Sequence, residues 1–580
     1  MFCHALRRAL VQRLSKSGSS RVPALSQAWL HPTTRRVCVA RPFGHDAFVS
    51  SDIAQPTRPI FGASDDTIYA LSSAPGRGAI AVIRVSGPGC LDVYRGLCPT
   101  ASLPKPRHAV VRTLVEPGRE DGVNVVDSDA VVLYFPGPKT ATGEDVLELD
   151  VHGGSATVKA VLSAIPKCSS STHVRYAEPG EFTKRAFLND RLDLSQVESL
   201  GDTLAAETEQ QRRAAVRGAS GALGKSYEDW RSQLLSARGE IEALIDFSED
   251  QHFDESPREL LANVTELVKQ ILQSIHVYKK GAQRSELLRN GIRIALLGPP
   301  NAGKSSLMNQ IVGREASIVS AEAGTTRDVV EASLDIRGYL CSFADTAGIR
   351  SNHASASTGD DTHSSVIGVV EQEGIRRARK KAQDADVIIV LASVERTKDG
   401  QTRLSYDLET LSLAAKAPEC LIVVNKCDVV DHETLAALVR EFRYSVLGPI
   451  RDLGGAEPLL ISCLEAETRT AELTDAGHIE CLTERLVQSF SALTSLPVDM
   501  QHLLGVTERQ SQLLEHCQAH LEDFMIEAQG RGLEGEPDIV LAAEHLRLAA
   551  NHLAAITGRG ESGDVEEVLG VIFEKFCVGK

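Results

Sequence analysis

The sequence predicts a multidomain protein of mixed α/β and α+β class, in which a β-rich domain precedes an all-α domain that is interrupted by an α/β domain. Its 580 residues exceed what one hydrophobic core organises. Short apolar runs separated by Gly/Pro turns give way to helical periodicity, then to alternating strands and helices, then to helical periodicity again. The predicted segments are a leader and linker at 1–60, the β-rich domain at 65–185, the helical domain at 186–290 and 491–580, and the α/β domain at 291–490.

The leader is basic. Its first 45 residues contain eight Lys and Arg and no acidic residue before Asp46. Ser and Thr are frequent, and the apolar core of a secretory signal is missing. This pattern is typical of a mitochondrial or chloroplast transit peptide. A disordered arm that binds nucleic acid is the alternative.

Composition and charge argue against a membrane protein, a disulfide-rich protein and a protein that binds RNA through its overall charge. Apolar residues make up 42% and charged residues 24%, and no run approaches the about 18 apolar residues of a membrane span. The twelve cysteines form no C-x-x-C or Cys/His cluster, so we expect neither a disulfide scaffold nor a structural zinc site. The net charge of −16 becomes −24 without the eight leader cations, so RNA binding needs a local basic patch or a partner.

Individual elements follow from local patterns. In the helical domain, one helix is expected to begin at Ser256-Pro257 and another to span 537–556 and stop at Gly558. The polar segment 351–368 is expected to be a disordered insertion in the α/β domain. Strands of the β-rich domain are predicted at 79–85, 130–135 and 146–151. Strands of a largely parallel sheet in the α/β domain are predicted at 293–298, 340–344, 387–391, 421–425 and 459–462.

A phosphate-binding loop follows the first predicted strand of the α/β domain. Residues 298–305 read GPPNAGKS and lie between the strand RIALLG and a helix. The glycines let the backbone wrap phosphate groups, and the helix N-terminus presents N–H donors. Lys304 is expected to reach the β- and γ-phosphates, and the Ser305 hydroxyl to bind Mg²⁺.

Three later motifs specify the base and the switch regions of a GTPase. Thr326 in GTTRD is expected to bind Mg²⁺, and Asp345 in DTAG to support that ion indirectly. Asp428 in NKCD is placed to accept both N–H donors of guanine, an edge that adenine lacks. The predicted GTP-binding residues are Asn301, Ala302, Gly303, Lys304, Ser305, Ser306, Thr325, Thr326, Asp345, Thr346, Ala347, Gly348, Asn425, Lys426, Asp428, Ser462 and Cys463.

The residue after DTAG is unusual for a GTPase. Ras-like enzymes place a water-orienting Gln there, whereas this chain has Ile349, which cannot hydrogen-bond water. Either hydrolysis is negligible, or another residue and another positive charge act instead. Asn301 is either a turn residue or an oxygen ligand of a monovalent cation beside the phosphates.

With these motifs, the chain from about Asp65 to Lys580 resembles the MnmE (or TrmE) family of tRNA-modifying GTPases, including its mitochondrial members. The further matching motifs are DTIYALSSAPGRGAIAVIRVSG at 66–87, TGEDVLEL and HGG within 142–154, PGEFTKRAFLNDRLDLSQVE at 179–198, and FCVGK at 576–580. The resemblance implies a folate-binding, aminomethyltransferase-like N-domain that forms a homodimer. It also implies a helical domain interrupted by a Ras-like P-loop GTPase domain.

The resemblance further implies an activity and its cofactors. K⁺-dependent GTP hydrolysis, with Mg²⁺, would be coupled to a carboxymethylaminomethyl- or taurinomethyl-type modification at C5 of the wobble uridine of mitochondrial tRNA. A tetrahydrofolate derivative (5-formyl or methylene) would supply the one-carbon unit. An FAD-dependent, MnmG/GidA-like subunit would complete a heterotetramer or larger assembly.

Site residues carry over by position. The folate contacts implied are Arg84, Glu148, Arg191 and Lys580, of which Arg191 departs from the family's Lys. The K⁺ ligands implied are Asn301, Ser320, Glu322 and Thr325. Ser320 is also implied in GTP binding. The Mg²⁺ ligands implied are Ser305 and Thr326. The catalytic residues implied are Glu371, which orients water, together with Lys304 and Cys577.

Several of these residues could instead have purely structural roles. Arg84 and Glu148 can be a strand-end Arg and a surface Glu, and Cys577 an inert surface thiol. The insertion 351–368 separates DTAG from Glu371, and Ser462-Cys463-Leu464 departs from the family's S-A-K/R. The basic patches Arg212, Arg213 and Arg217, and the run from Arg376 to Lys381, are either tRNA contacts or solvated helix faces; we expect the partner subunit to supply much of the tRNA contact.

Two other functions remain as alternatives. One is a switch GTPase, such as a ribosome-assembly factor, although no RNA-binding motif accompanies the GTPase motifs. The other is a folate-binding scaffold with a vestigial GTPase. The intact set Lys304, Ser305, Thr326 and Asp345 argues against a vestigial site.

Overall fold

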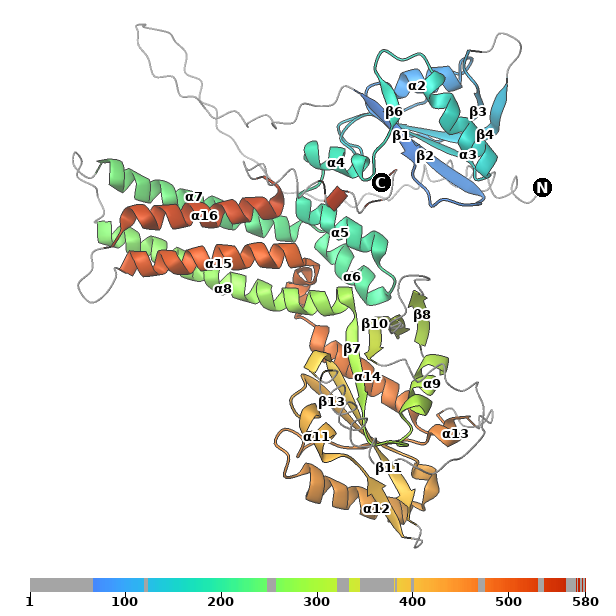
Figure 1. Cartoon of the computed structure of the whole chain (residues 1–580). Coiled ribbons are helices and arrows are strands. Elements are labelled where there is room, and N and C mark those ends of the chain that lie inside the picture. Colours follow the sequence, from blue (N-terminus) through green and yellow to red (C-terminus); the bar gives the residue numbers. More distant parts are fainter. Residues whose placement is uncertain are drawn as a thin grey trace, which may run out of the picture. The chain divides into compact units, whose positions relative to one another are not determined.

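The computed structural model (Figure 1) describes much of the chain beyond the leader. It describes residues 66–579 apart from 119–123, 248–256, 315, 321–332, 345–379, 381–382, 398–400, 468–474, 530–536, 560–569, 571, 574–575 and 577–578. The predicted leader at 1–60 and the predicted insertion at 351–368 lie outside the described residues. No described helix has both the length and the apolar composition needed to cross a membrane.

The N-terminal domain is built on a six-stranded sheet of order β3-β4-β5-β2-β1-β6, in which only the β1–β6 pair is parallel. The strands are β1 (Thr67–Leu71), β2 (Ile80–Ser86), β3 (Val110–Val115), β4 (Val125–Phe135), β5 (Val146–His152) and β6 (Val174–Tyr176). The helices α2 (Cys90–Leu97) and α3 (Ser155–Ala164) share one core with the sheet. The three strands predicted from apolar runs are confirmed as β2, β4 and β5.

A charged cluster joins this sheet to α4 (Glu181–Leu188). The Arg185 side chain is 5% exposed and donates to three carboxylates, Asp66 at 2.7 Å, Glu144 at 3.0 Å and Glu181 at 3.1 Å. Arg175 pairs with Asp66 and Glu181 as well. Burial on its own would raise the pKa values of Asp66 and Glu181, but the two guanidinium groups outweigh it and lower both.

Helices that precede and follow the α/β domain in the sequence share one hydrophobic core and form the helical domain. Figure 1 shows α7, α8, α15 and α16 side by side, and their buried apolar residues form a single cluster. The bounds are α5 (Leu194–Ala205), α6 (Glu209–Gly218), α7 (Ala222–Phe247), α8 (Pro257–Asn290), η5 (Val498–Gly505), α15 (Glu508–Gln529) and α16 (Ile539–Thr557). As predicted, α8 begins at Pro257 and α16 stops at Gly558, whose φ of 78° suits a residue without a Cβ.

The α/β domain has an eight-stranded sheet with the path β14-β13-β11-β7-β10-β9-β8, and β12 pairs with β11. Its strands are β7 (Ile292–Leu297), β8 (Ala316–Ser320), β9 (Ser333–Ile336), β10 (Tyr339–Ala344), β11 (Val387–Arg396), β12 (Thr402–Ser405), β13 (Glu419–Asn425) and β14 (Leu459–Leu460). Its helical segments are α9 (Lys304–Arg314), α11 (Leu408–Ala414), η3 (Cys427–Val429), α12 (His432–Glu441), η4 (Phe442–Leu447), α13 (Cys463–Glu467) and α14 (Ile479–Thr494). Two apolar clusters take residues from the sheet and its helices.

The predicted parallel sheet is confirmed, with two differences. The pairs β10–β7, β7–β11, β11–β13 and β13–β14 are parallel, but β9 runs antiparallel to both β8 and β10. The last strand, predicted at 459–462, ends at Leu460 because Ser462 turns toward Asp428. Helix α14 extends to Thr494, and its Phe490 is buried in the α/β core.

Candidate functional site

The phosphate-binding loop lies where β7 ends, between its parallel neighbours β10 and β11. Three of its residues have positive φ angles, Gly298 at 143°, Asn301 at 62° and Gly303 at 98°. A Cβ at Gly298 would overlap the carbonyl oxygen of Leu391 on β11. The loop therefore needs glycine both for its backbone angles and for its close approach to the sheet.

Lys304 is held over this loop. Its Nζ donates to the carbonyl oxygens of Gly298 and Pro299, each at 2.8 Å. The side chains of Ser305 and Ser306 are exposed in the first turn of α9. A cation and two hydroxyls thus stand at a helix N-terminus, where N–H groups and the helix dipole favour an anion such as a phosphate.

Asn425, at the end of β13, ties the phosphate loop to the loop after β14. It is 2% exposed; its Nδ2 donates to the carbonyl oxygen of Ala302 at 2.9 Å, and its Oδ1 accepts from the backbone N–H of Cys463 at 3.2 Å. A Cβ on Gly303 would overlap the Asn425 amide. The phosphate and base halves of the site are therefore fixed to each other by one buried side chain.

The Asp428 carboxylate is oriented by a neighbouring hydroxyl. Ser462 Oγ donates to Asp428 Oδ1 at 2.6 Å and accepts from the backbone N–H of Glu465 at 3.1 Å. Lys426 has a φ of 62°, which turns the chain sharply between Asn425 and Asp428. A carboxylate has about four acceptor positions, so Asp428 can still accept from a base. Burial raises the pKa of the nearby Cys463 thiol to about 11, so that thiol is neutral.

A second group of predicted site residues lies on the N-terminal sheet. Arg84 on β2 stands opposite Glu148 on β5, and its Nη2 lies 2.8 Å from Glu148 Oε1. Both side chains are about a quarter exposed, 25% and 23%. The Arg84 guanidinium carbon also lies 5.9 Å from the ring centroid of Phe182. An accessible cation, a carboxylate and an aromatic face therefore meet at one place on this sheet.

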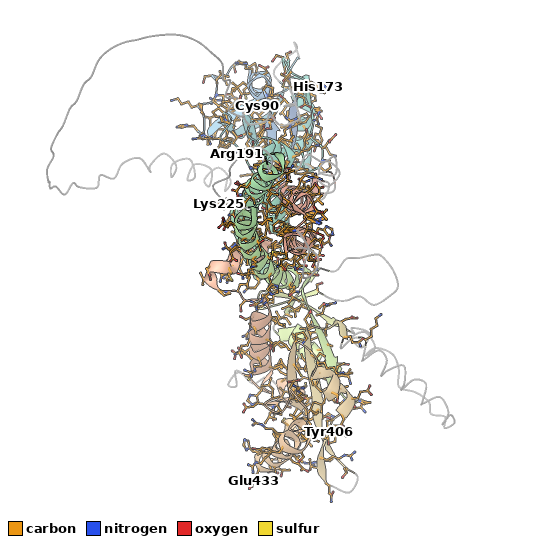
Figure 2. All side chains as sticks on the ribbon, turned by 90° about the vertical axis from the view of Figure 1, so that its left-hand side faces the viewer. Cys90, His173, Arg191, Lys225, Tyr406 and Glu433 are labelled. Atoms are coloured by element: carbon orange, nitrogen blue, oxygen red, sulfur yellow. The ribbon has the colours of Figure 1, made fainter. Side chains whose placement is uncertain are left out.

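Arg191 and Gly579 each contact the N-terminal domain, at different places. Arg191, labelled in Figure 2, donates from Nε to the carbonyl oxygen of Thr140 at 3.0 Å, in the connection between β4 and β5. The carbonyl oxygen of Gly579 accepts from Ser72 Oγ at 2.8 Å, just after β1. The structure thus pairs Arg84 with Glu148 but gives Arg191 a different partner.

Comparison with known proteins decides the family. The family model of the MnmE helical domain matches residues 194–577, and that of the GTP-binding protein TrmE N-terminus matches residues 67–191. The human mitochondrial 5-taurinomethyluridine-[tRNA] synthase subunit GTPB3 is 37% identical over 551 residues, 94% of this chain and 97% of that protein. The chain belongs to the MnmE family of tRNA modification GTPases.

Other MnmE relatives are similar over most of their length. The tRNA modification GTPase MnmE of Rhodopseudomonas palustris is 36% identical and covers 89% of this chain and 99% of its own. The mitochondrial tRNA modification GTPase mss1 of Schizosaccharomyces pombe is 36% identical and covers 89% of this chain and 95% of its own. Family membership confirms the prediction of a GTPase in tRNA modification.

Several predicted residues of the MnmE site lie outside the described residues or have only their backbone described. Outside are Glu322, Thr325, Thr326, Asp345, Thr346, Ala347, Gly348, Glu371, Cys577 and Lys580. For Ser320 the structure gives the strand position, the last residue of β8, and no side chain. The Mg²⁺, K⁺ and water-orienting roles therefore stay predictions. Two contacts were not predicted, the Phe182 ring beside Arg84 and the Ser72 hydroxyl on Gly579, although both residues lie inside the matching motifs.

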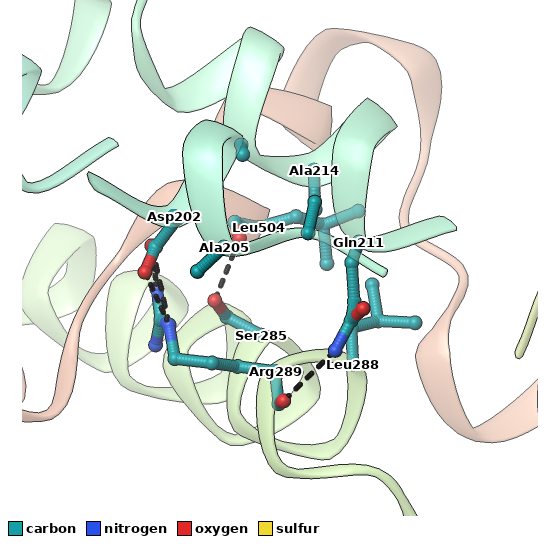
Figure 3. A pocket seen from close by; sticks show the side chains of 10 residues that line it. Asp202, Ala205, Gln211, Ala214, Ser285, Leu288, Arg289 and Leu504 are labelled. Carbon is teal, nitrogen blue, oxygen red and sulfur yellow. Dashed lines mark hydrogen bonds and ion pairs between the residues drawn. The ribbon is translucent and has the colours of Figure 1, made fainter. Parts of the chain in front are cut away.

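A cavity of about 90 Å³ lies away from these residues, between α5, α6, α8 and η5 (Figure 3). Its polar side chains are already engaged: Arg289 pairs with Asp202 at 2.7 Å, Gln211 donates to the Arg289 carbonyl, and Ser285 donates to Leu504. These contacts hold α5, α6, α8 and η5 together. The cavity therefore has a packing role.

Proposed function

We propose that this chain is a mitochondrial matrix GTPase that couples K⁺-dependent GTP hydrolysis to folate-dependent modification at C5 of the tRNA wobble uridine. One observation carries the proposal. A nucleotide site built around Asn425 and Asp428 and an accessible Arg84–Glu148 pair occur together in one chain of the MnmE family. The basic leader and the word mitochondrial in the names of the human and fission-yeast relatives support the location. The human relative's name supports a taurinomethyl-type product.

At the nucleotide site, Lys304 would bind the β- and γ-phosphates, and the exposed Ser305 hydroxyl would face Mg²⁺ together with Thr326. Asn301, exposed and held at a positive φ by the loop, would turn its amide oxygen to K⁺ with Ser320, Glu322 and Thr325. When bound, the two cations supply positive charge against the charge that develops on the phosphates. Glu371 would orient the attacking water in place of the Gln that Ile349 replaces.

At the folate site, the donor set fits a tetrahydrofolate. Arg84 donates from Nε and Nη2 to Glu148 Oε1, and Oε2 has no hydrogen-bond partner among the described residues. That oxygen can accept from the donor edge of a pterin, while Arg84, Arg191 and Lys580 can neutralise a folate carboxylate. The folate, 5-formyl or methylene, would supply the one-carbon unit, and Cys577 would act as a catalytic residue.

The assembly we propose has three components. The domain at 65–185 would form a homodimer, and an FAD-dependent MnmG/GidA-like subunit would complete a heterotetramer or larger complex. The relatives' description as a synthase subunit supports such a partner. Because the chain without its leader carries a formal charge of −24, the partner would supply much of the contact with mitochondrial tRNA.

Nucleoside mass spectrometry of mitochondrial tRNA tests the proposal. Cells lacking the protein should lose the modified wobble uridine, and wild type should restore it, whereas Lys304→Ala and Cys577→Ser should not. Cys481→Ser is the matched control, because Cys481 is an exposed, free cysteine in the α/β domain. An unchanged wobble uridine in the knockout would refute the modification and leave a switch GTPase.

A further inference from the structure

Four histidines line the contact between α15 and α16 in the helical domain. The rings of His516 and His552 have centroids 5.3 Å apart, those of His520 and His552 are 5.3 Å apart and stacked, and those of His520 and His545 are 5.8 Å apart. The row therefore alternates between two helices that pack along their length. None of these residues belongs to the nucleotide or folate site.

Three side chains of this region converge on one point. His520, Asp523 and His545 each offer one ligand atom, and these atoms all lie within 4.8 Å of one another. His520 and Asp523 are three residues apart, a spacing that puts both on one face of α15. His545 reaches them from α16. Since α15 and α16 are separate helices, the grouping is tertiary.

Two nitrogens of the cluster lack a hydrogen-bond partner. Within the described part of the chain, Nδ1 of His520 and Nδ1 of His545 are shielded from solvent and make no hydrogen bond. A buried polar atom without a partner costs about 1–3 kcal/mol, so an empty arrangement of this kind is unfavourable.

We propose that His520, His545 and Asp523 bind one divalent transition-metal ion of the zinc class and thereby join α15 to α16. Two imidazoles and one carboxylate suit Zn²⁺, Co²⁺ or Ni²⁺, whereas Mg²⁺ and Ca²⁺ prefer oxygen ligands alone. In a tetrahedral zinc site with bonds of about 2.0–2.1 Å, neighbouring ligands lie about 3.3 Å apart. The three ligand atoms lie within 4.8 Å of one another, so binding a metal would require their side chains to rotate closer together. Water would fill the fourth position.

The spacing of these three residues is not a recognisable metal-binding motif. His520 and Asp523 form an H-x-x-D pair on a long helix, and His545 follows only on the next helix. No cysteine takes part, whereas the expectation of no structural zinc site followed from the lack of C-x-x-C and Cys/His clusters.

Metal titration of the full-length, chelator-treated protein tests the proposal. Co²⁺ is the probe, because its absorption spectrum separates thiolate ligation by the twelve cysteines from nitrogen and oxygen ligation. Wild type should bind one Co²⁺ per chain without a thiolate band, and Zn²⁺ should displace it. His545→Ala and Asp523→Asn should weaken binding at least about tenfold. His516→Ala, one turn away and exposed, should keep full affinity.

A second readout separates metal loss from misfolding. Zn²⁺ should raise the thermal unfolding temperature of wild type and of His516→Ala, but not of Asp523→Asn, because only a ligand of the folded state stabilises it. Asp523 is exposed, so its amide variant keeps the helix intact. The proposal is overturned if wild type binds no Co²⁺ through nitrogen and oxygen, or if the three variants bind it equally.

Discussion

Replacing Asp428 by Asn should change the base preference of the nucleotide site from guanine to xanthine. In the structure, Ser462 Oγ donates to Asp428 Oδ1 at 2.6 Å, which fixes the plane of the carboxylate beside the base pocket. Asp428 then offers acceptors to the two N–H donors of guanine. An amide at this position has the same shape but offers one acceptor and one donor.

The size of the effect follows from these groups. Guanine loses one charge-assisted hydrogen bond, about 1.5–3 kcal/mol, and one of its donors faces another donor, at about 1–3 kcal/mol. The sum of about 2.5–6 kcal/mol corresponds to a GTP affinity about 10²- to 10⁴-fold lower. Xanthine has a carbonyl where guanine has its amino group, so it matches the amide. Xanthosine triphosphate should therefore bind more tightly than GTP to Asp428→Asn.

Competition against a fluorescent nucleotide measures both affinities. Ser462→Ala is the matched control, because it removes the hydroxyl that orients Asp428 and keeps the carboxylate. It should weaken GTP binding by about fivefold, the loss of about 1 kcal/mol, without changing the preferred base. If Asp428→Asn binds GTP as tightly as wild type does, Asp428 does not contact the base.

Three further changes test the phosphate loop, the folate pair and the charged cluster. Gly303→Ala, at a φ of 98° and with its new Cβ against the Asn425 amide, should reduce GTP affinity more than tenfold in the same competition assay. Glu148→Gln should change the free energy of unfolding by less than about 1 kcal/mol, because its pair with Arg84 is partly exposed, yet abolish most binding of 5-formyltetrahydrofolate in calorimetry; unchanged binding would argue for a surface ion pair only. Arg185→Met should destabilise the domain by about 3–5 kcal/mol in chemical denaturation, because it leaves the Glu144 carboxylate without a cation and leaves Asp66 and Glu181 with Arg175 alone. In wild type, the carboxylates of this cluster with lowered pKa values stabilise the fold above their unfolded pKa values of about 4, and this contribution should be lost as the pH falls below about 4.

The parts of the fold that the sequence predicted are those whose cause is local. An apolar run between turn residues forms a buried strand whatever its position in the sheet. The strands β2, β7 and β13 therefore lie close to their predicted bounds. The phosphate loop is local too, because its glycines are required by backbone angles within eight residues. The early end of β14 was missed because it depends on Ser462 turning toward Asp428, a contact between two segments.

The parts that the sequence could not predict depend on which segments pack together. Asn425 was expected to contribute to the nucleotide site, but its buried bonds to Ala302 and Cys463 require three separate loops to meet. The grouping of His520 with His545 requires two helices to pack in one register. Neither grouping produces a recognisable spacing in the sequence, because the number of residues between the contacting segments does not determine whether they meet.

The exposed fraction of a side chain distinguishes structural from binding roles for residues in the same sequence motifs. Arg84 and Arg185 both lie in segments that match the family, and both pair with glutamates. Arg185 is 5% exposed and surrounded by three carboxylates, so no ligand can reach it and its role is to hold α4 on the sheet. Arg84 is 25% exposed, and its partner Glu148 keeps an oxygen without a bond among the described residues. The one-oxygen pairing of Arg84 and Glu148 leaves Oε2 available as an acceptor, which is consistent with the proposed folate site.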